Sequence, residues 1–221
     1  MLSLSLNSAC RSYPMPLGPL SPLSPLSPLS PLSAPGLLTV RRGDPRRAAV
    51  EAFVRRVYAQ RYGADVRQFA PSLVALLDAE GEVVAAAGYR AASEEPLFLE
   101  RYLGAPVQTL LGPGPAPSRS RIVEVGHLAS ARAGEGRRLI LMLGPHLAEQ
   151  GFQWVVGTLT EELRHLFVRL GVSPLELGVA DPGVLGAEAS HWGSYYDHRP
   201  VVLAGHIEAA LQALGRRRML S

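Results

Sequence analysis

The segment 121–171 constrains the fold more than any other part of this 221-residue chain. Its pattern predicts a strand, a turn, a helix, a second short strand and a second helix. The turn contains Gly134, Gly136, Arg137 and Arg138. At a helix start, unpaired backbone N–H groups and the helix dipole favour an anion, and arginine adds forked donors. We therefore predict an anionic ligand at this turn, the alternative being an ordinary exposed loop.

The N-terminal part of the chain is rich in proline. Serine, proline and leucine repeat four times from Ser21 onward. Proline at every third position removes backbone donors and fixes φ, so neither a helix nor a central strand can form there. We expect residues 1–36 to be a disordered tail and residues 37–221 to form one domain, which is long enough for a sizeable core.

Composition excludes several kinds of chemistry. All 22 basic residues are arginine, so lysine Schiff-base chemistry and lysine general bases are excluded. The one cysteine, Cys10, falls in the predicted tail, and the histidines show no metal-ligand spacing, so we expect neither disulfides nor a metal site in the domain. The net charge of +3 is too small to indicate a nucleic-acid partner. Without a signal peptide or a run of transmembrane length, we expect a cytoplasmic protein.

Hydrophobic periodicity predicts alternating helices and strands. Two early apolar runs flank the turn 78–81 and read as an antiparallel hairpin, while Thr158 and Glu161 match a capping box. Such alternation, with an antiparallel hairpin, predicts an α/β layered fold with a mixed sheet. The predicted helices are 44–62, 95–103, 135–150, 158–170 and 206–214, and the predicted strands are 71–77, 83–89, 122–129, 154–157, 175–180 and 201–204.

Two titratable residues lie three apart on the predicted strand 122–129. Glu124 stands between two valines, and His127 follows Gly126. In a regular strand their side chains would point to opposite faces, but a bulge near Gly126 would bring them together. A charge flanked by apolar residues indicates a partner or a task. We consider both residues as catalytic candidates, the alternative being an edge position or an internal salt bridge.

A second candidate segment is His-Trp-Gly-Ser-Tyr-Tyr at positions 191–196. Aromatic side chains combine a large apolar area with polar tips, which suits the wall of a ligand site. Trp192, Tyr195 and Tyr196 are therefore candidate substrate-binding residues. The alternative is a packed loop that covers the sheet.

Several of these motifs together resemble a known family. Val-Glu-Val-Gly-His-Leu-Ala at 123–129, Gly-Arg-Arg-Leu at 136–139, the pair Gly157-Thr158, the helix end 166–171 and the Trp-Gly-Ser-Tyr-Tyr segment resemble the bacterial thermostable hemolysin family over residues 46–210. That family is similar to the GNAT acyltransferase fold and to acyl-homoserine-lactone synthases. The sequence departs from these patterns at three positions. His127 stands where the family pattern has asparagine. Phe167 replaces the tyrosine of the acetyltransferases, and Ala131 replaces the glutamine or arginine with which their phosphate loop begins.

The resemblance implies a GNAT-like domain, in which a mixed, mostly antiparallel central sheet is flanked by helices in three αβα layers. It also implies a thioester-bound acyl group in the splay between two strands, carried by acyl-CoA or by the phosphopantetheine of an acyl carrier protein, as a co-substrate and not a tightly bound cofactor. The implied phosphate ligands are Gly134, Gly136, Arg137 and Arg138. The backbone around Gly126 and Leu128 would polarise the thioester, and Glu124 would act as general base, with His127 beside it.

Three functions remain open at this point. The first is an N-acyltransferase that moves an acyl group to a small amine such as an amino acid, with Trp192, Tyr195 and Tyr196 bordering the pocket. The second, suggested by the family's name, is a membrane-active cytolysin. The third is a module that binds an acyl thioester without turning it over. The acyl chain, the acceptor and the oligomeric state stay open.

Overall fold

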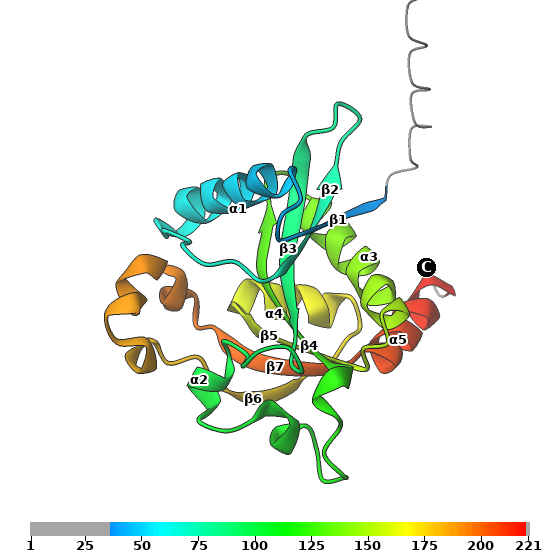
Figure 1. Cartoon of the computed structure of the whole chain (residues 1–221). Helices are drawn as coiled ribbons and strands as arrows, with labels where there is room; N and C mark the ends of the chain where they lie inside the picture. The colour runs from blue at the N-terminus through cyan, green and yellow to red at the C-terminus, as the bar shows by residue number, and fades with distance from the viewer. Residues whose placement is uncertain (1–35, 220–221) are drawn as a thin grey trace, which may run out of the picture. The chain divides into compact units, whose positions relative to one another are not determined.

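The computed structural model describes residues 36–219, and the predicted tail lies outside the described residues except for its last position. Figure 1 shows a central sheet with α1 on one side and α3 with α5 on the other. The sheet has seven strands in the order β1-β2-β3-β4-β5-β7-β6, and only β4 and β5 are parallel neighbours. This arrangement confirms the predicted GNAT-like, mostly antiparallel α/β fold.

The strands match the predicted ones and add one more. β1 (Leu37–Arg41), which periodicity did not predict, pairs with the first strand of the predicted hairpin. The others are β2 (Ser72–Leu77), β3 (Val83–Ala91), β4 (Ile122–Ser130), β5 (Trp154–Leu159), β6 (Leu175–Val179) and β7 (Val201–His206).

Two helices pack against opposite faces of the sheet through apolar stripes. α1 (Arg47–Tyr62) buries Val50, Phe53, Val54 and Tyr58 against one face. α3 (Glu135–Glu149) buries a leucine stripe against the other face, where α5 (Ile207–Met219) lies beside it. Burial of these stripes provides most of the stabilisation of such layers.

The first helix begins three residues later than its predicted start at Asp44. Asp44 accepts a hydrogen bond from the Arg46 amide (2.9 Å), which forms a turn before the helix instead of its first residues. The helix then ends as expected for its sequence, because Gly63 adopts a left-handed conformation and donates its N–H to the Ala59 carbonyl.

Two other predicted boundaries are wrong. The helix expected over 95–103 shrinks to α2 (Glu100–Leu103), because the amides of Phe98 and Leu99 are drawn to Glu124 on β4. The capping box at Thr158 is also wrong, since Thr158 lies inside β5, where the ladder to β7 continues through Leu159. α4 (Glu161–Arg169) instead begins after Thr160.

Short 3-10 segments complete the domain. η1 (Val107–Leu110) and η2 (Arg119–Arg121) precede β4, while η3 (Pro182–Trp192) and η4 (Tyr195–His198) lead into β7. The predicted aromatic segment therefore lies in two consecutive 3-10 turns. Among the described residues, no helix is long and apolar enough to cross a bilayer.

Candidate functional site

The parallel strands β4 and β5 separate half-way along their length. Their ladder contains three residue pairs and ends where Glu124 meets Val156. Beyond that point β5 keeps pairing with β7 through Leu159, and β4 keeps pairing with β3. The two strands therefore splay apart, and backbone between Val125 and Leu128 faces a gap in the middle of the sheet.

A bulge in β4 lies at this splay. Gly126 pairs with Gly88 and Ala129 pairs with Ala86, so two residues of β4 face the single Ala87 of β3. The extra residue is His127, whose φ of 54° lies in the left-handed region that few non-glycine residues occupy. The bulge puts His127 on the same face of the sheet as Glu124, where both line one pocket. A bulge beside Gly126, the condition under which Glu124 and His127 would come together, is thus present.

Glu124 is buried, with 8% of its surface exposed. Its two carboxylate oxygens accept hydrogen bonds from the amides of Phe98 (2.9 Å) and Leu99 (3.0 Å), and the Arg90 Nε lies 3.3 Å away. Burial raises the pKa of the Glu124 carboxyl, against the opposing effects of Arg90 and the two amides. Glu124 therefore anchors the segment before α2 and also offers the site a carboxylate with increased proton affinity.

His127 is held on three sides. Its Nε2 lies 3.1 Å from the Gln68 carbonyl oxygen, and its ring packs on Phe69 with centroids 5.2 Å apart. Because a carbonyl only accepts, Nε2 carries the proton and Nδ1 is an unprotonated acceptor. Nδ1 has no hydrogen-bond partner among the residues that the structure describes, and it lies 2.8 Å from the position of a Cβ on Gly88. Burial lowers the pKa of His127 to about 4, so the imidazole is neutral and faces β3.

On this face of the sheet the splay opens into a pocket of about 350 Å³, here called the aromatic pocket. Trp192 and Tyr195 line it, whereas Tyr196 is not one of its lining residues and has its hydroxyl 2.7 Å from the Tyr102 hydroxyl. Thr158 on β5 also lines the pocket, and its buried hydroxyl has no hydrogen-bond partner in the described part of the chain. The wall also includes Tyr58, Tyr62, Asp65, Val66, Arg67, Gln68, Ala70, Arg90, Phe98, Tyr102, Leu163, Glu188 and His191.

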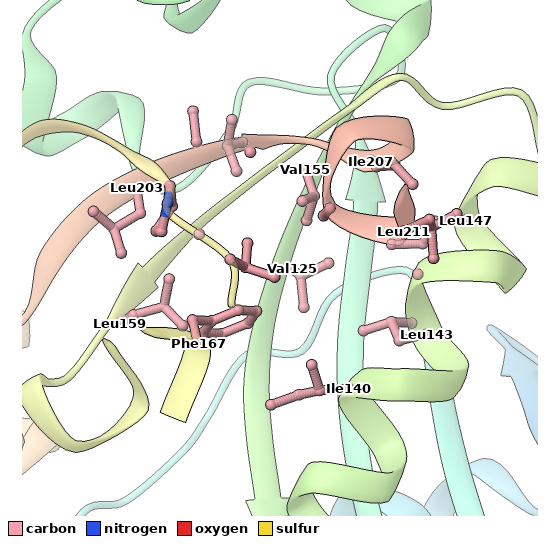
Figure 2. Close-up of a pocket in the computed structure, with 18 of the residues that line it drawn as sticks. Val125, Ile140, Leu143, Leu147, Val155, Leu159, Phe167, Leu203, Ile207 and Leu211 are labelled. Atoms are coloured by element: carbon pink, nitrogen blue, oxygen red, sulfur yellow. The ribbon is translucent and has the colours of Figure 1, made fainter. Parts of the chain in front are cut away.

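On the opposite face the splay opens into a second cavity of about 120 Å³, here called the apolar chamber. Figure 2 shows side chains from the sheet, α3, α4 and α5 converging on it. Every lining residue is aliphatic, phenylalanine, proline or glycine. Val125 and Leu128 line both cavities, so the two cavities border the same stretch of β4 at the splay.

The turn predicted to hold phosphate forms the start of α3. Gly134 is left-handed (φ 87°), and the Arg138 amide donates to its carbonyl. The Gly136 and Arg137 amides have no acceptor among the described residues. Arg137 is exposed, whereas the Arg138 guanidinium lies 3.4 Å from the Glu135 carboxylate. Within the described residues, the turn therefore offers two free amides and one unpaired arginine.

Sequence reasoning missed the apolar chamber and the part of the aromatic pocket contributed by α1, α2 and β5. Periodicity places Tyr58 only in a helix stripe, and the capping pattern places Thr158 only at a helix start. The apolar stripe of α4 is visible in the sequence, but only the structure shows that none of the residues of this helix is fully buried. Its Leu163 and Phe167 instead line the two cavities.

Solved structures with the same fold come from acyl-transferring enzymes. FeeM, an N-acyl amino acid synthase from uncultured soil microbes, superposes with a TM-score of 0.58 at 13% identity, covering 81% of this chain and 96% of its own. BjaI, a CoA-dependent acyl-homoserine lactone synthase described with SAM and isopentyl-CoA, gives 0.58 at 14%, covering 82% and 88%. The acyl-homoserine lactone synthase LasI gives 0.54 at 18%, covering 79% and 93%. These likenesses establish the fold.

The family assignment rests on sequence. No curated protein sequence matches the chain. The model of one family, thermostable hemolysin, matches residues 40–211 and so spans nearly all of the domain described above. It includes the β4 bulge, the turn before α3 and the aromatic segment that borders the splay. The chain therefore belongs to the thermostable hemolysin family.

Proposed function

We propose that this protein is an N-acyltransferase that moves an acyl group from a phosphopantetheine thioester to a small amine. The observation that carries the proposal is the splay between β4 and β5, which opens into one cavity on each face of the sheet. A transferase must bring two substrates to one point. Here the two cavities share the lining residues Val125 and Leu128 on β4.

The donor would enter along β4. The turn at the start of α3 supports this placement, since its free amides and Arg137 suit the phosphate of the pantetheine arm. The thioester carbonyl would then lie at the bulge, where backbone amides around Gly126 and Leu128 polarise it. Either acyl-CoA or an acyl carrier protein can present this arm. The solved structures with this fold include one CoA-dependent enzyme, BjaI, described with isopentyl-CoA.

The acceptor amine would occupy the aromatic pocket, bordered by Trp192 and Tyr195. The Thr158 hydroxyl, unpartnered among the described residues, is suited to a polar group of the acceptor. The described N-acyl amino acid synthase supports an amino acid as one candidate acceptor. Tyr196 would act indirectly, by fixing Tyr102 through their hydroxyl pair.

In the reaction, the acceptor ammonium first loses a proton to Glu124 through a water molecule. The free amine attacks the thioester carbonyl, so that a C–N bond forms and the C–S bond breaks; one of its two protons passes to the leaving sulfur and the other stays on the amide nitrogen. Because the pKa of its carboxyl is raised, Glu124 is a better base at neutral pH than an ordinary exposed carboxylate. His127 is a positioning residue in this scheme, because its Nε2 is bonded to Gln68 and its Nδ1 faces β3.

The test is to incubate the purified protein with hexanoyl-CoA and a mixture of amino acids and simple amines. Thiol release is followed by colorimetry and N-hexanoyl products by mass spectrometry. Amine-dependent thiol release with a matching amide supports the proposal. Amine-independent thiol release indicates a hydrolase, and thioester binding without transfer indicates a binding module. Dye release from liposomes without any donor indicates a cytolysin, and each of these three outcomes overturns the proposal.

A further inference from the structure

We infer that the apolar chamber holds the tail of the acyl group, and that the contact between Gly144 on α3 and Leu211 on α5 sets the length of tail that fits. This inference rests on the proposed function and identifies its donor as a medium-length aliphatic thioester. The chamber is a second part of the donor site, on the face of the sheet opposite the aromatic pocket.

The composition of the chamber excludes a polar occupant. No lining side chain carries a hydrogen-bonding group in the part of the chain that the structure describes. The pantetheine arm contains two amides, and burying them there without partners would be unfavourable. Water is disfavoured for the same reason, because buried water needs polar partners. An aliphatic chain has no such requirement.

The position of the chamber identifies which aliphatic chain it would hold. Val125 and Leu128 line the chamber, and they lie beside and in the β4 bulge, where the thioester carbonyl would be placed. A chain attached to that carbonyl can enter the chamber directly. Figure 2 shows Ile140 and Leu143 of α3 facing Phe167 and Val125 across the space, with Leu211 at the end nearer α5.

The size of the chamber sets the expected length. Its volume of about 120 Å³ compares with the roughly 150 Å³ of an apolar protein cavity that binds benzene. In proportion, it accommodates roughly five carbon atoms beyond the carbonyl. An acetyl group would leave it empty, and an empty chamber forfeits the contacts of its lining side chains.

Gly144 on α3 and Leu211 on α5 adjoin each other in the wall of the chamber. A Cβ on Gly144 would lie 3.3 Å from the Cδ2 atom of Leu211, the flexible end of a side chain on α5. Alanine can therefore be accommodated by a small movement of Leu211. A leucine side chain at position 144 would extend into the chamber and occupy the space proposed for the acyl tail.

The experiment is calorimetric titration of the full chain with CoA, acetyl-CoA, butyryl-CoA, hexanoyl-CoA and decanoyl-CoA. Each methylene buried in the chamber should raise the affinity of the thioester about fourfold, up to hexanoyl-CoA. Hexanoyl-CoA should therefore bind on the order of a hundredfold more tightly than acetyl-CoA. Gly144→Leu should abolish this gain while leaving CoA and acetyl-CoA binding unchanged, and Leu211→Ala should extend the gain toward decanoyl-CoA. Glu149→Leu, which adds an apolar side chain at an exposed position of α3, is the control.

The outcomes separate the two proposals. If CoA and acetyl-CoA bind but affinity does not change with chain length, the inference is overturned and the proposed function stands. The inference is also overturned, and the proposed function retained, if Gly144→Leu and Glu149→Leu behave alike. If neither CoA nor any thioester binds, the proposed function fails and the inference fails with it. Gly144→Ala is a smaller change, which should shorten the preferred acyl chain without loss of folding. This variant is used in the test if Gly144→Leu does not fold.

Discussion

The carbonyl oxygen of Val125 lies 2.7 Å from the position that a Cβ atom on Gly157 would occupy. These two residues face each other at the first positions beyond the last β4–β5 pair. A side chain at Gly157 would press on backbone, which cannot give way as a flexible side-chain end can. The glycine therefore sets how closely β4 and β5 approach where they begin to splay.

Gly157→Ala should consequently destabilise the domain and weaken thioester binding. We expect a loss of about 1–3 kcal/mol in the free energy of unfolding, typical of overpacking, measured by urea denaturation. Gly205→Ala on β7 is the matched control, because its Cβ would make an ordinary contact of 3.7 Å with Val155. An equal loss in both variants would contradict a special role for the Val125–Gly157 contact.

Arg137→Gln tests the proposed phosphate site. Arg137 is exposed and forms no ion pair with any residue that the structure describes, whereas Arg138 is paired with Glu135. Removing a charged hydrogen bond to phosphate should weaken binding of hexanoyl-phosphopantetheine about tenfold. Binding of hexanoyl-pantetheine, which lacks the phosphate, should not change, and Arg169→Gln should affect neither ligand. Equal weakening of both ligands would place the phosphate elsewhere.

Much of the fold was accessible from sequence because its signals are local. The helix stripe of Val50 and Phe53, the hairpin around the turn 78–81 and the strand that contains Glu124 each follow from periodicity over a few residues. The boundaries that failed depend on partners far along the chain. Phe98 and Leu99 lie outside the helix because their amides donate hydrogen bonds to Glu124. Thr158 stays extended because it pairs with β7.

The candidate site was accessible only in part for the same reason. A charge between two valines marked Glu124, and the aromatic run marked Trp192. The apolar chamber could not be predicted, since its residues resemble an ordinary core and only the separation of β4 from β5 leaves them around a cavity. Roles within the site were also not deducible. A sequence motif does not reveal that the Glu124 oxygens already accept hydrogen bonds from two backbone amides.

Glu124→Gln must be interpreted against that anchoring role. A glutamine would place an NH2 group against a backbone amide, costing about 1–3 kcal/mol and loosening the segment before α2. Glu100 is a matched control, because its oxygens accept the amides of Leu97 (3.0 Å) and Val107 (2.9 Å) at the other end of the same segment. Burial would raise the pKa of Glu100, but Arg119 and these amides lower it overall.

If Glu124 is the base, Glu124→Gln should reduce turnover by about two orders of magnitude while donor affinity, measured by titration, is largely retained. Glu100→Gln should loosen the same segment yet keep most of its turnover. Since the pKa of the Glu124 carboxyl is raised, wild-type turnover should fall as acidification protonates it. A similar fall in turnover for both variants would assign Glu124 to anchoring alone.

His127→Asn should remove one component of acid sensitivity. The His127 pKa is about 4 in the folded protein and about 6.5 when exposed, so between these values the unfolded chain binds the extra proton. The contribution of this residue to the free energy of unfolding should thus be complete above pH 6.5 and should fall by about 3 kcal/mol by pH 4. Asparagine does not titrate and is more tolerant of the left-handed φ at the bulge.

The difference between wild type and His127→Asn, measured by urea denaturation from pH 4 to 8, isolates this contribution. His146 also has a pKa lowered by burial, but it is present in both proteins and cancels in the difference. His146→Asn is the control and should leave the His127 component in place. If wild type and His127→Asn lose stability in parallel below pH 6.5, the imidazole is not held neutral between Gln68 and Gly88.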